Sequence, residues 1–145
     1  MDYRKLAIDE LRNIEQLRAA EKVCRDRLAE LNAELHSIKI PSPQTDPVKG
    51  GGNKVEERWL NLIAAKMDEE RRLKSIQRRL RRFNTAWAVL SERDQAVLTE
   101  FYITGGKTPA ERIATKEHCD VRTAYRWRDE AIICFARAFF GEVVA

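Results

Sequence analysis

Apolar residues recur every three or four positions along two long stretches of the chain, residues 3–39 and 54–90. This spacing places them on one face of an α-helix, while Glu, Lys and Arg occupy the other faces. The first apolar stripe contains Ile14, Leu17, Cys24, Leu28, Leu31, Leu35 and Ile38. The second contains Trp59, Leu62, Leu73, Ile76, Leu80, Phe83, Trp87 and Leu90, with polar Lys66 and Glu69 in its middle. Both stripes have the heptad spacing of a coiled coil, so we predict two long helices.

The segment between the two stripes is rich in proline and glycine, which disfavour a continued helix. We therefore predict an N-terminal coiled-coil helix over residues 1–40, a linker over 41–53 and a second long helix over 54–90. The two helices pair either as an antiparallel hairpin within one chain or as a coiled coil between chains, and the pattern allows both. Asn84 and Thr85 cap helices well, so the second helix has a candidate break there.

Residues 91–145 change to shorter helices with capping signals. Ser91 and Asp94 have the spacing of a capping box at the start of one helix, and Gly105–Gly106 suits a left-handed helix end. Aromatic and branched side chains supply a candidate core for this region: Trp87, Phe101, Ile113, Trp127 and Ile132. We predict an all-α protein in which a long antiparallel helical hairpin or coiled coil is followed by a domain of three short helices.

The last two of these helices begin close together in the chain. Thr108 is a candidate N-cap, with Pro109 at the first helical position and Glu111 at the capping-box position. Asp120 is the candidate N-cap of the final helix, with a side chain free to accept a backbone N–H of the first turn. The inward face of that helix is marked by Ala124, Trp127 and Ala131. Two short helices joined by a tight turn, with a small residue where they cross, predict a helix-turn-helix DNA-binding unit.

The final helix is the candidate recognition helix, whose first two turns carry the base contacts in such motifs. Arg122 and Arg126 lie one turn apart on its outer face, and each guanidinium fork matches O6 and N7 of guanine. Val121 is placed to touch a thymine methyl group. Candidate phosphate contacts are Thr108, Thr123 and Tyr125. The alternative is that the two arginines only solubilise an exposed helix.

The formal net charge of +4 is distributed unevenly. Residues 54–90 hold 10 basic and 5 acidic side chains, whereas residues 91–145 hold 8 and 9. The excess forms a run without an intervening acid: Arg71, Arg72, Lys74, Arg78, Arg79, Arg81 and Arg82. This run is either a solvated helix face or a surface that contacts DNA phosphates. The candidates for phosphate contact are Arg78, Arg79, Arg81 and Arg82.

Several functional classes have no signal in the sequence. No apolar run approaches the roughly 20 residues of a membrane span, and the first residues lack the apolar core of a signal peptide. Three widely spaced cysteines at apolar helical positions are typical of small core residues in a reducing compartment, so we expect a cytoplasmic protein. The only histidines, His36 and His118, lie on different predicted elements, so we expect neither an enzyme, a metal site nor a cofactor.

Three stretches of the C-terminal region resemble the promoter-binding region 4 of bacterial sigma factors. They are "LSERDQAVLTEFYI", "TPAERIA" and "DVRTAYRWRDEAI". Together with an upstream helix, the "SPxxxxPVKGGG"-like linker at Ser42–Gly52 and a long charged helix, they resemble phage late-gene transcriptional activators of the RinA/ArpU type. These proteins tend to carry a Ser-x-x-Thr-Val-Tyr-Arg run, which this chain matches at Thr123, Tyr125 and Arg126. Asp120 stands in place of the serine and Ala124 in place of the valine.

The resemblance implies a phage or prophage regulator in the cytoplasm of a bacterial host, binding double-stranded DNA and activating late promoters through host RNA polymerase. Two positions depart from the pattern: His118 stands where the turn prefers glycine, and Glu117 where an apolar residue usually packs. Because the C-terminal region is close to neutral, a homodimer, the basic helix or a protein partner must add affinity for DNA. The alternatives are a small-terminase-like protein that marks DNA for packaging, and a helical adaptor that binds RNA polymerase without touching DNA.

Overall fold

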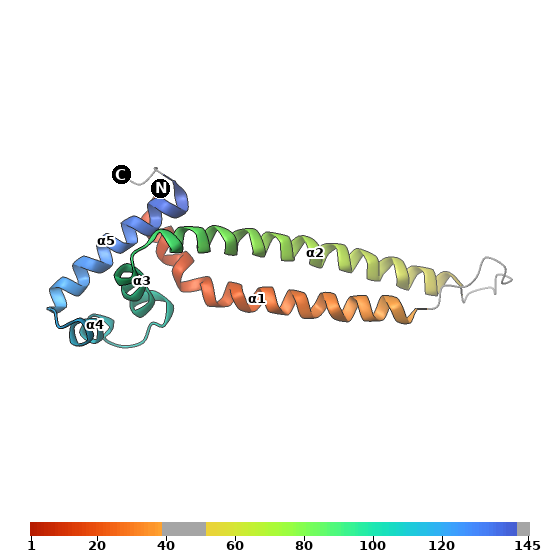
Figure 1. Ribbon diagram of the computed structural model, residues 1–145. Coiled ribbons are helices and arrows are strands. Elements are labelled where there is room, and N and C mark those ends of the chain that lie inside the picture. Colours follow the sequence, from red (N-terminus) through yellow and green to blue (C-terminus); the bar gives the residue numbers. More distant parts are fainter. Residues whose placement is uncertain (39–51, 142–145) are drawn as a thin grey trace. The chain divides into compact units, whose positions relative to one another are not determined.

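The chain is all-α in the computed structural model, which describes residues 1–38 and 52–141 (Figure 1). The elements are α1 (Tyr3–Ser37), α2 (Gly52–Val89), α3 (Glu92–Leu98), a π-helical turn η1 (Thr99–Ile103), α4 (Pro109–Glu117) and α5 (Val121–Phe140). No strand occurs within those two ranges, which confirms the predicted fold class. Residues 41–51 of the predicted linker lie outside the described residues.

The contacts divide the chain into two compact units that cut across the predicted ranges. The hairpin unit comprises residues 19–77, and the terminal unit comprises residues 1–18 together with 78–145. The boundary between the long helices and the C-terminal region, expected near residue 91, is therefore not where the compact units meet.

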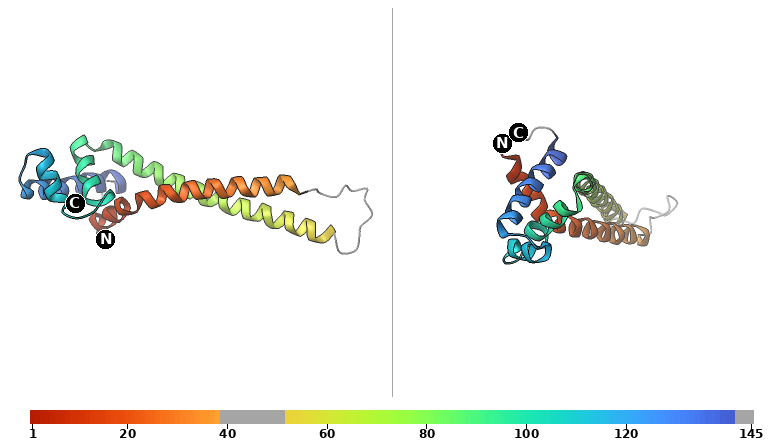
Figure 2. Two further views of the ribbon diagram at one scale, coloured as in Figure 1. Left: turned by 90° about the horizontal axis from the view of Figure 1, so that it is seen from below. Right: turned by 60° about the vertical axis from the view of Figure 1, so that its left-hand side comes forward.

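In the hairpin unit α1 and α2 run side by side in antiparallel directions (Figure 2). Cys24 of α1 and Glu69 of α2, both members of the predicted stripes, are buried. The Glu69 carboxylate lies 3.4 Å from a guanidinium nitrogen of Arg27 on the facing helix and 3.4 Å from one of Arg72. Burial, and then a hydrogen bond with Glu69, raise the pKa of the Cys24 thiol. The two stripes therefore pair within one chain.

The terminal unit has an aromatic core that the end of α2 shares with α5. The rings of Phe83 and Phe135 are 5.3 Å apart and both side chains are fully buried. The beginning of α1 adds buried apolar residues at Ala7, Leu11 and Ile14. Of the predicted core, two members are buried and three aromatic members are half-buried: Ile113, Ile132, Trp87, Phe101 and Trp127.

The candidate break in α2 is wrong, because the helix continues to Val89. The Thr85 hydroxyl donates to the Arg81 carbonyl one turn earlier, at 2.9 Å, which satisfies the hydroxyl inside the helix instead of at a cap. Nearby Ala86 is buried and holds this stretch of α2 against the unit. The cysteine prediction is also wrong in part: Cys119 is half-buried and Cys134 is exposed.

The predicted helix start at Ser91 is confirmed, but only half of the predicted capping box forms, because no hydrogen bond among the described residues joins the Asp94 carboxylate to the Ser91 N–H and the buried Asp94 Oδ1 has no hydrogen-bond partner there. The Ser91 hydroxyl accepts the backbone N–H of Asp94 at 3.1 Å, as an N-cap residue does. The helix then widens into η1, where the Thr104 N–H donates to the Thr99 carbonyl at 2.8 Å. Gly105 and Gly106 follow with positive φ, which glycine adopts without strain. None of the helices in the described ranges is long and apolar enough to span a membrane.

Candidate nucleic-acid interface

Helices α4 and α5 are joined by a short turn, as predicted, and pack on α3 through a small apolar cluster. Its buried members are Val97, Ala110, Ile113 and Ala124. Ala124 is 0% exposed, and a side chain no larger than a methyl group lets the helices approach closely there. The cluster therefore fixes which side of α5 faces inward.

The turn between the two helices is closed by a left-handed residue at His118. The Cys119 N–H donates to the Ala114 carbonyl at 3.0 Å, which is the pattern of a Schellman helix end. His118 occupies the position that favours glycine, with φ of 53°. Glu117 is exposed, so the departure from an apolar residue does not disturb the packing.

Helix α5 begins where it was predicted to begin, directly after Asp120. The backbone of Asp120 is extended, as an N-cap residue requires, but its carboxylate makes no capping hydrogen bond. The predicted side-chain cap is therefore wrong, although the helix start is correct. The Ala124 N–H donates to the Asp120 carbonyl at 3.1 Å and makes the first bond of the helix.

The outer face of α5 presents two arginines. Arg122 and Arg126 are both exposed, and within the described residues neither makes a hydrogen bond, an ion pair or a cation–π contact. They are separated by one helical turn and lie on the side away from buried Ala124 and Ala131. Two adjacent guanidinium forks are thus free to bind an external partner.

The other candidates on this helix are more engaged with the protein. Val121 is half-buried and packs against the apolar cluster, so only part of its side chain faces outward. Its contact with a thymine methyl group stays a prediction. Thr123 is half-buried. Tyr125 is 42% exposed, with its ring 5.8 Å from that of Phe101 and the Arg128 guanidinium 4.9 Å above it. Along the chain it follows Arg122 by three residues and directly precedes Arg126.

Thr108 does not cap α4. Its φ and ψ are 54° and 52°, in the left-handed region, whereas an N-cap needs an extended backbone to direct its hydroxyl at the first turn. Its side chain accordingly makes no capping hydrogen bond. Pro109 does occupy the start of the helix, as predicted. Thr108 is exposed, and its contact with a phosphate stays a prediction.

Arg112 of α4, which the sequence did not single out, fastens the loop that precedes the helix. Its Nε lies 3.0 Å from the Glu100 carboxylate, and its Nη2 donates to the Gly105 carbonyl at 2.8 Å. Its Nη1 donates to the Lys107 carbonyl. One guanidinium thereby ties η1, the loop and α4 together and fixes the entry into the helix-turn-helix.

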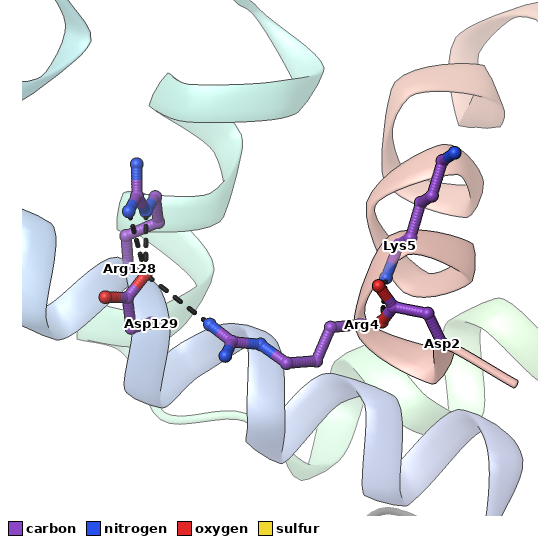
Figure 3. Close-up of polar contacts among 5 residues, drawn as sticks. All are labelled: Asp2, Arg4, Lys5, Arg128 and Asp129. Carbon is purple, nitrogen blue, oxygen red and sulfur yellow. Dashed lines mark hydrogen bonds and ion pairs between the residues drawn. The ribbon is translucent and has the colours of Figure 1, made fainter.

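The beginning of α1 contacts the flank of α5 (Figure 3). Arg4 lies 3.8 Å from the Asp129 carboxylate, which also accepts from Arg128 at 2.9 Å. The Asp2 carboxylate accepts the Lys5 N–H at 3.1 Å and caps α1 at this point. These two cations match the charge of Asp129. Sequence periodicity contains no signal for this contact because the two helices are far apart along the chain.

The basic run on α2 divides into engaged and free arginines. Arg79 donates to the Glu10 carboxylate at 2.8 Å and 3.3 Å, and this hydrogen bond raises the pKa of the guanidinium. Arg82 donates to the Phe139 carbonyl at 2.9 Å and lies over the Phe139 ring. Arg78 and Arg81 are exposed, and their guanidinium groups contact no partner within the described parts of the chain. Arg79 and Arg82 hold helices together, so among the four arginines predicted to contact phosphates only Arg78 and Arg81 keep their charge available.

Among the side chains in residues 1–38 and 52–141, no group of three or more His, Cys, Asp or Glu is placed to hold a metal ion. Comparison with known proteins found no matching family model, no matching curated protein and no matching solved structure.

Proposed function

We propose that this protein is a sequence-specific DNA-binding regulator of transcription in which α5 enters the major groove. The observation that carries the proposal is the pair Arg122 and Arg126, exposed and unpartnered among the described residues on the outer side of the second helix of a helix-turn-helix. Arginine forks at this position read guanine through O6 and N7. Removing water from free guanidinium groups costs free energy, which a partner rich in hydrogen-bond acceptors can offset. The edge of a DNA groove with its flanking phosphates is such a partner.

The charge of the terminal unit favours the same partner. Residues 1–18 and 78–145 together contain 16 Lys and Arg against 13 Asp and Glu, whereas residues 91–145 alone contain 8 against 9. The excess of basic side chains in the terminal unit comes mainly from the end of α2, where Arg78 and Arg81 are exposed. These two side chains are suited to phosphate contacts, which add affinity without sequence information.

The regulatory part of the proposal rests on the resemblance to RinA/ArpU-type activators. On that basis we propose a phage or prophage protein that acts at late promoters together with the host RNA polymerase. Its test is run-off transcription by a bacterial RNA polymerase from a template carrying the selected binding site. Stimulation by the full-length protein is expected, and unchanged transcription in spite of site occupancy would contradict activation while leaving DNA binding intact.

DNA binding is tested by selecting duplexes from a random pool with the purified protein and then measuring affinity for the selected site. Arg122→Ala or Arg126→Ala should each cost about 1–3 kcal/mol, a roughly fivefold to 150-fold loss of affinity, and relax the preference at one base pair. Arg58→Ala, which removes an exposed arginine from the hairpin unit, is the matched control and should change little.

Phosphate contacts have a separate signature. Arg78→Ala and Arg81→Ala should weaken binding to all duplexes alike and lower the slope of affinity against salt by about 1 each. If no sequence is enriched, or if the Arg122 and Arg126 variants bind the selected site like the unchanged protein, α5 is not a recognition helix.

A further inference from the structure

Helix α2 carries a second apolar stripe inside the hairpin unit, distinct from the stripe that faces α1. Its members are Leu60, Ile63 and Met67, spaced by three and then four residues so that they line one side of the helix. Leu60 is 58% exposed and Met67 is 48% exposed, while Ile63 is half-buried. Ile63 and Met67 line an open groove whose walls include Trp59 and, from α1, Leu35.

Two helices alone cannot cover these side chains. Most members of the stripes between α1 and α2 in this unit are themselves only half-buried: Leu28, Leu31, Leu35, Trp59, Leu62, Leu73 and Ile76. The stripes between α1 and α2 are thus half-covered, and the second stripe on α2 is uncovered. Packing a further helix against them would stabilise the pair. The stripe is therefore a surface suited to a further helix.

The charges at the two ends of the stripe indicate which helix fits it. Glu56 and Glu57 precede the stripe on α2, and Arg71 and Lys74 follow it, and all four side chains are exposed. A second α2 laid antiparallel along the stripe brings Glu56 and Glu57 of each copy to Lys74 and Arg71 of the other. A parallel arrangement would place like charges together. The surface is thus complementary to itself under a two-fold axis, as an isologous dimer requires.

We propose that a second copy of this chain docks on the stripe, with α2 antiparallel to the partner's α2 and the two-fold axis between Ile63 and Met67. Ile63 of each copy then packs on Met67 of the other, and Glu56 faces Lys74. The two hairpins form a four-helix assembly in which the half-covered seam and the groove are both buried. This inference concerns the hairpin unit alone and does not rest on DNA binding by α5.

The first test measures the mass of the full-length protein by sedimentation equilibrium over a series of concentrations, without DNA. The unchanged protein should be a dimer in reversible equilibrium with monomer. Met67→Glu should shift it to monomer, because the substitution buries a carboxylate at the centre of the contact. Val23→Glu is the matched control: Val23 is 56% exposed on α1, outside the stripe, and its replacement should leave the dimer intact. Far-ultraviolet circular dichroism confirms that each variant keeps its helices.

The second test uses charge reversal, which distinguishes this antiparallel contact from other modes of association. Glu56→Lys with Glu57→Lys should raise the dimer dissociation constant by at least about tenfold, and so should Arg71→Glu with Lys74→Glu. All four changes in one chain restore opposite charges across the proposed interface, although Arg71→Glu loses the 3.2 Å ion pair with Asp68 of the same helix. The dissociation constant should return to within about threefold of its original value. A monomer at every soluble concentration, a dimer that tolerates Met67→Glu, or a quadruple variant no better than the double variants would each overturn the proposal.

Discussion

Two residues in left-handed conformation mark the ends of α4. Thr108 and His118 have φ values of 54° and 53°, where a side chain with a Cβ is strained. The sequence predicts the second, because His118 falls where a helix-to-helix turn prefers glycine. It does not predict the first, because Thr108 followed by Pro109 and Glu111 has the spacing of a capping box. Arg112 donates hydrogen bonds to the loop before α4, where the backbone of Thr108 is left-handed and not extended. The spacing of residues in the sequence does not predict these hydrogen bonds.

Replacing His118 by glycine should stabilise the terminal unit. The change relieves the left-handed strain and is partly offset by the greater freedom of glycine in the unfolded chain, so we expect a gain of about 0.5–1 kcal/mol. The neighbouring Glu117→Gly, at the last helical position, should instead lower the free energy of unfolding by up to about 1 kcal/mol. Urea denaturation measures both. A loss of stability in both variants would show that residue 118 is not left-handed.

At the scale of secondary structure, the long helices follow directly from the sequence. Residues 3–39 and 54–90 were expected, and α1 and α2 span Tyr3–Ser37 and Gly52–Val89. Heptad spacing over many turns leaves little freedom in such an assignment. The turn η1 and the role of Arg112 were not predictable in the same way. Both depend on where the carbonyl groups of a short loop lie in space, and neither corresponds to a periodic pattern of residues in the sequence.

Arg112→Ala should loosen the junction between η1 and α4. The guanidinium makes charge-assisted hydrogen bonds to Glu100, Gly105 and Lys107, but it is partly solvated, so we expect a loss of about 1–2 kcal/mol. Hydrogen exchange in the loop should accelerate more than exchange in α5. Arg122→Ala makes the same chemical change at an exposed side chain and should cost less than about 0.5 kcal/mol. Equal losses in the two variants would contradict the fastening role.

At the scale of the whole molecule, the assignment of the first helical turns was incomplete. The predicted stripe in the first helix begins at Ile14, yet Ala7 and Leu11 are also fully buried, within the terminal unit. A heptad pattern identifies a helix and its apolar face, but it does not identify the partner that covers that face. Of the candidate site, the exposed arginines of α5 lie where the sequence placed them. Val121, Arg79 and Arg82 proved to be engaged with the protein itself, because tertiary contacts decide which surface side chains stay free.

The role of the first helical turns is tested by one substitution at two positions. Leu11→Ala removes a side chain that is 0% exposed and should destabilise the terminal unit by about 3 kcal/mol. Leu6→Ala makes the same change at a side chain that is 37% exposed and should cost less than about 1 kcal/mol. Thermal unfolding followed by tryptophan fluorescence reports both, since Trp87 and Trp127 lie in that unit. Equal costs would show that residues 1–18 do not belong to it.

The contact between Arg4 and Asp129 joins positions near opposite ends of the 145-residue sequence. During synthesis on the ribosome, residues 1–18 emerge long before α5 exists, and their buried face must wait for the rest of the chain. The hairpin unit, whose partners come from nearer positions in the sequence, is complete first. We expect closure of the terminal unit to be a late step, because residues 1–18 contact α5 only after it has been synthesised.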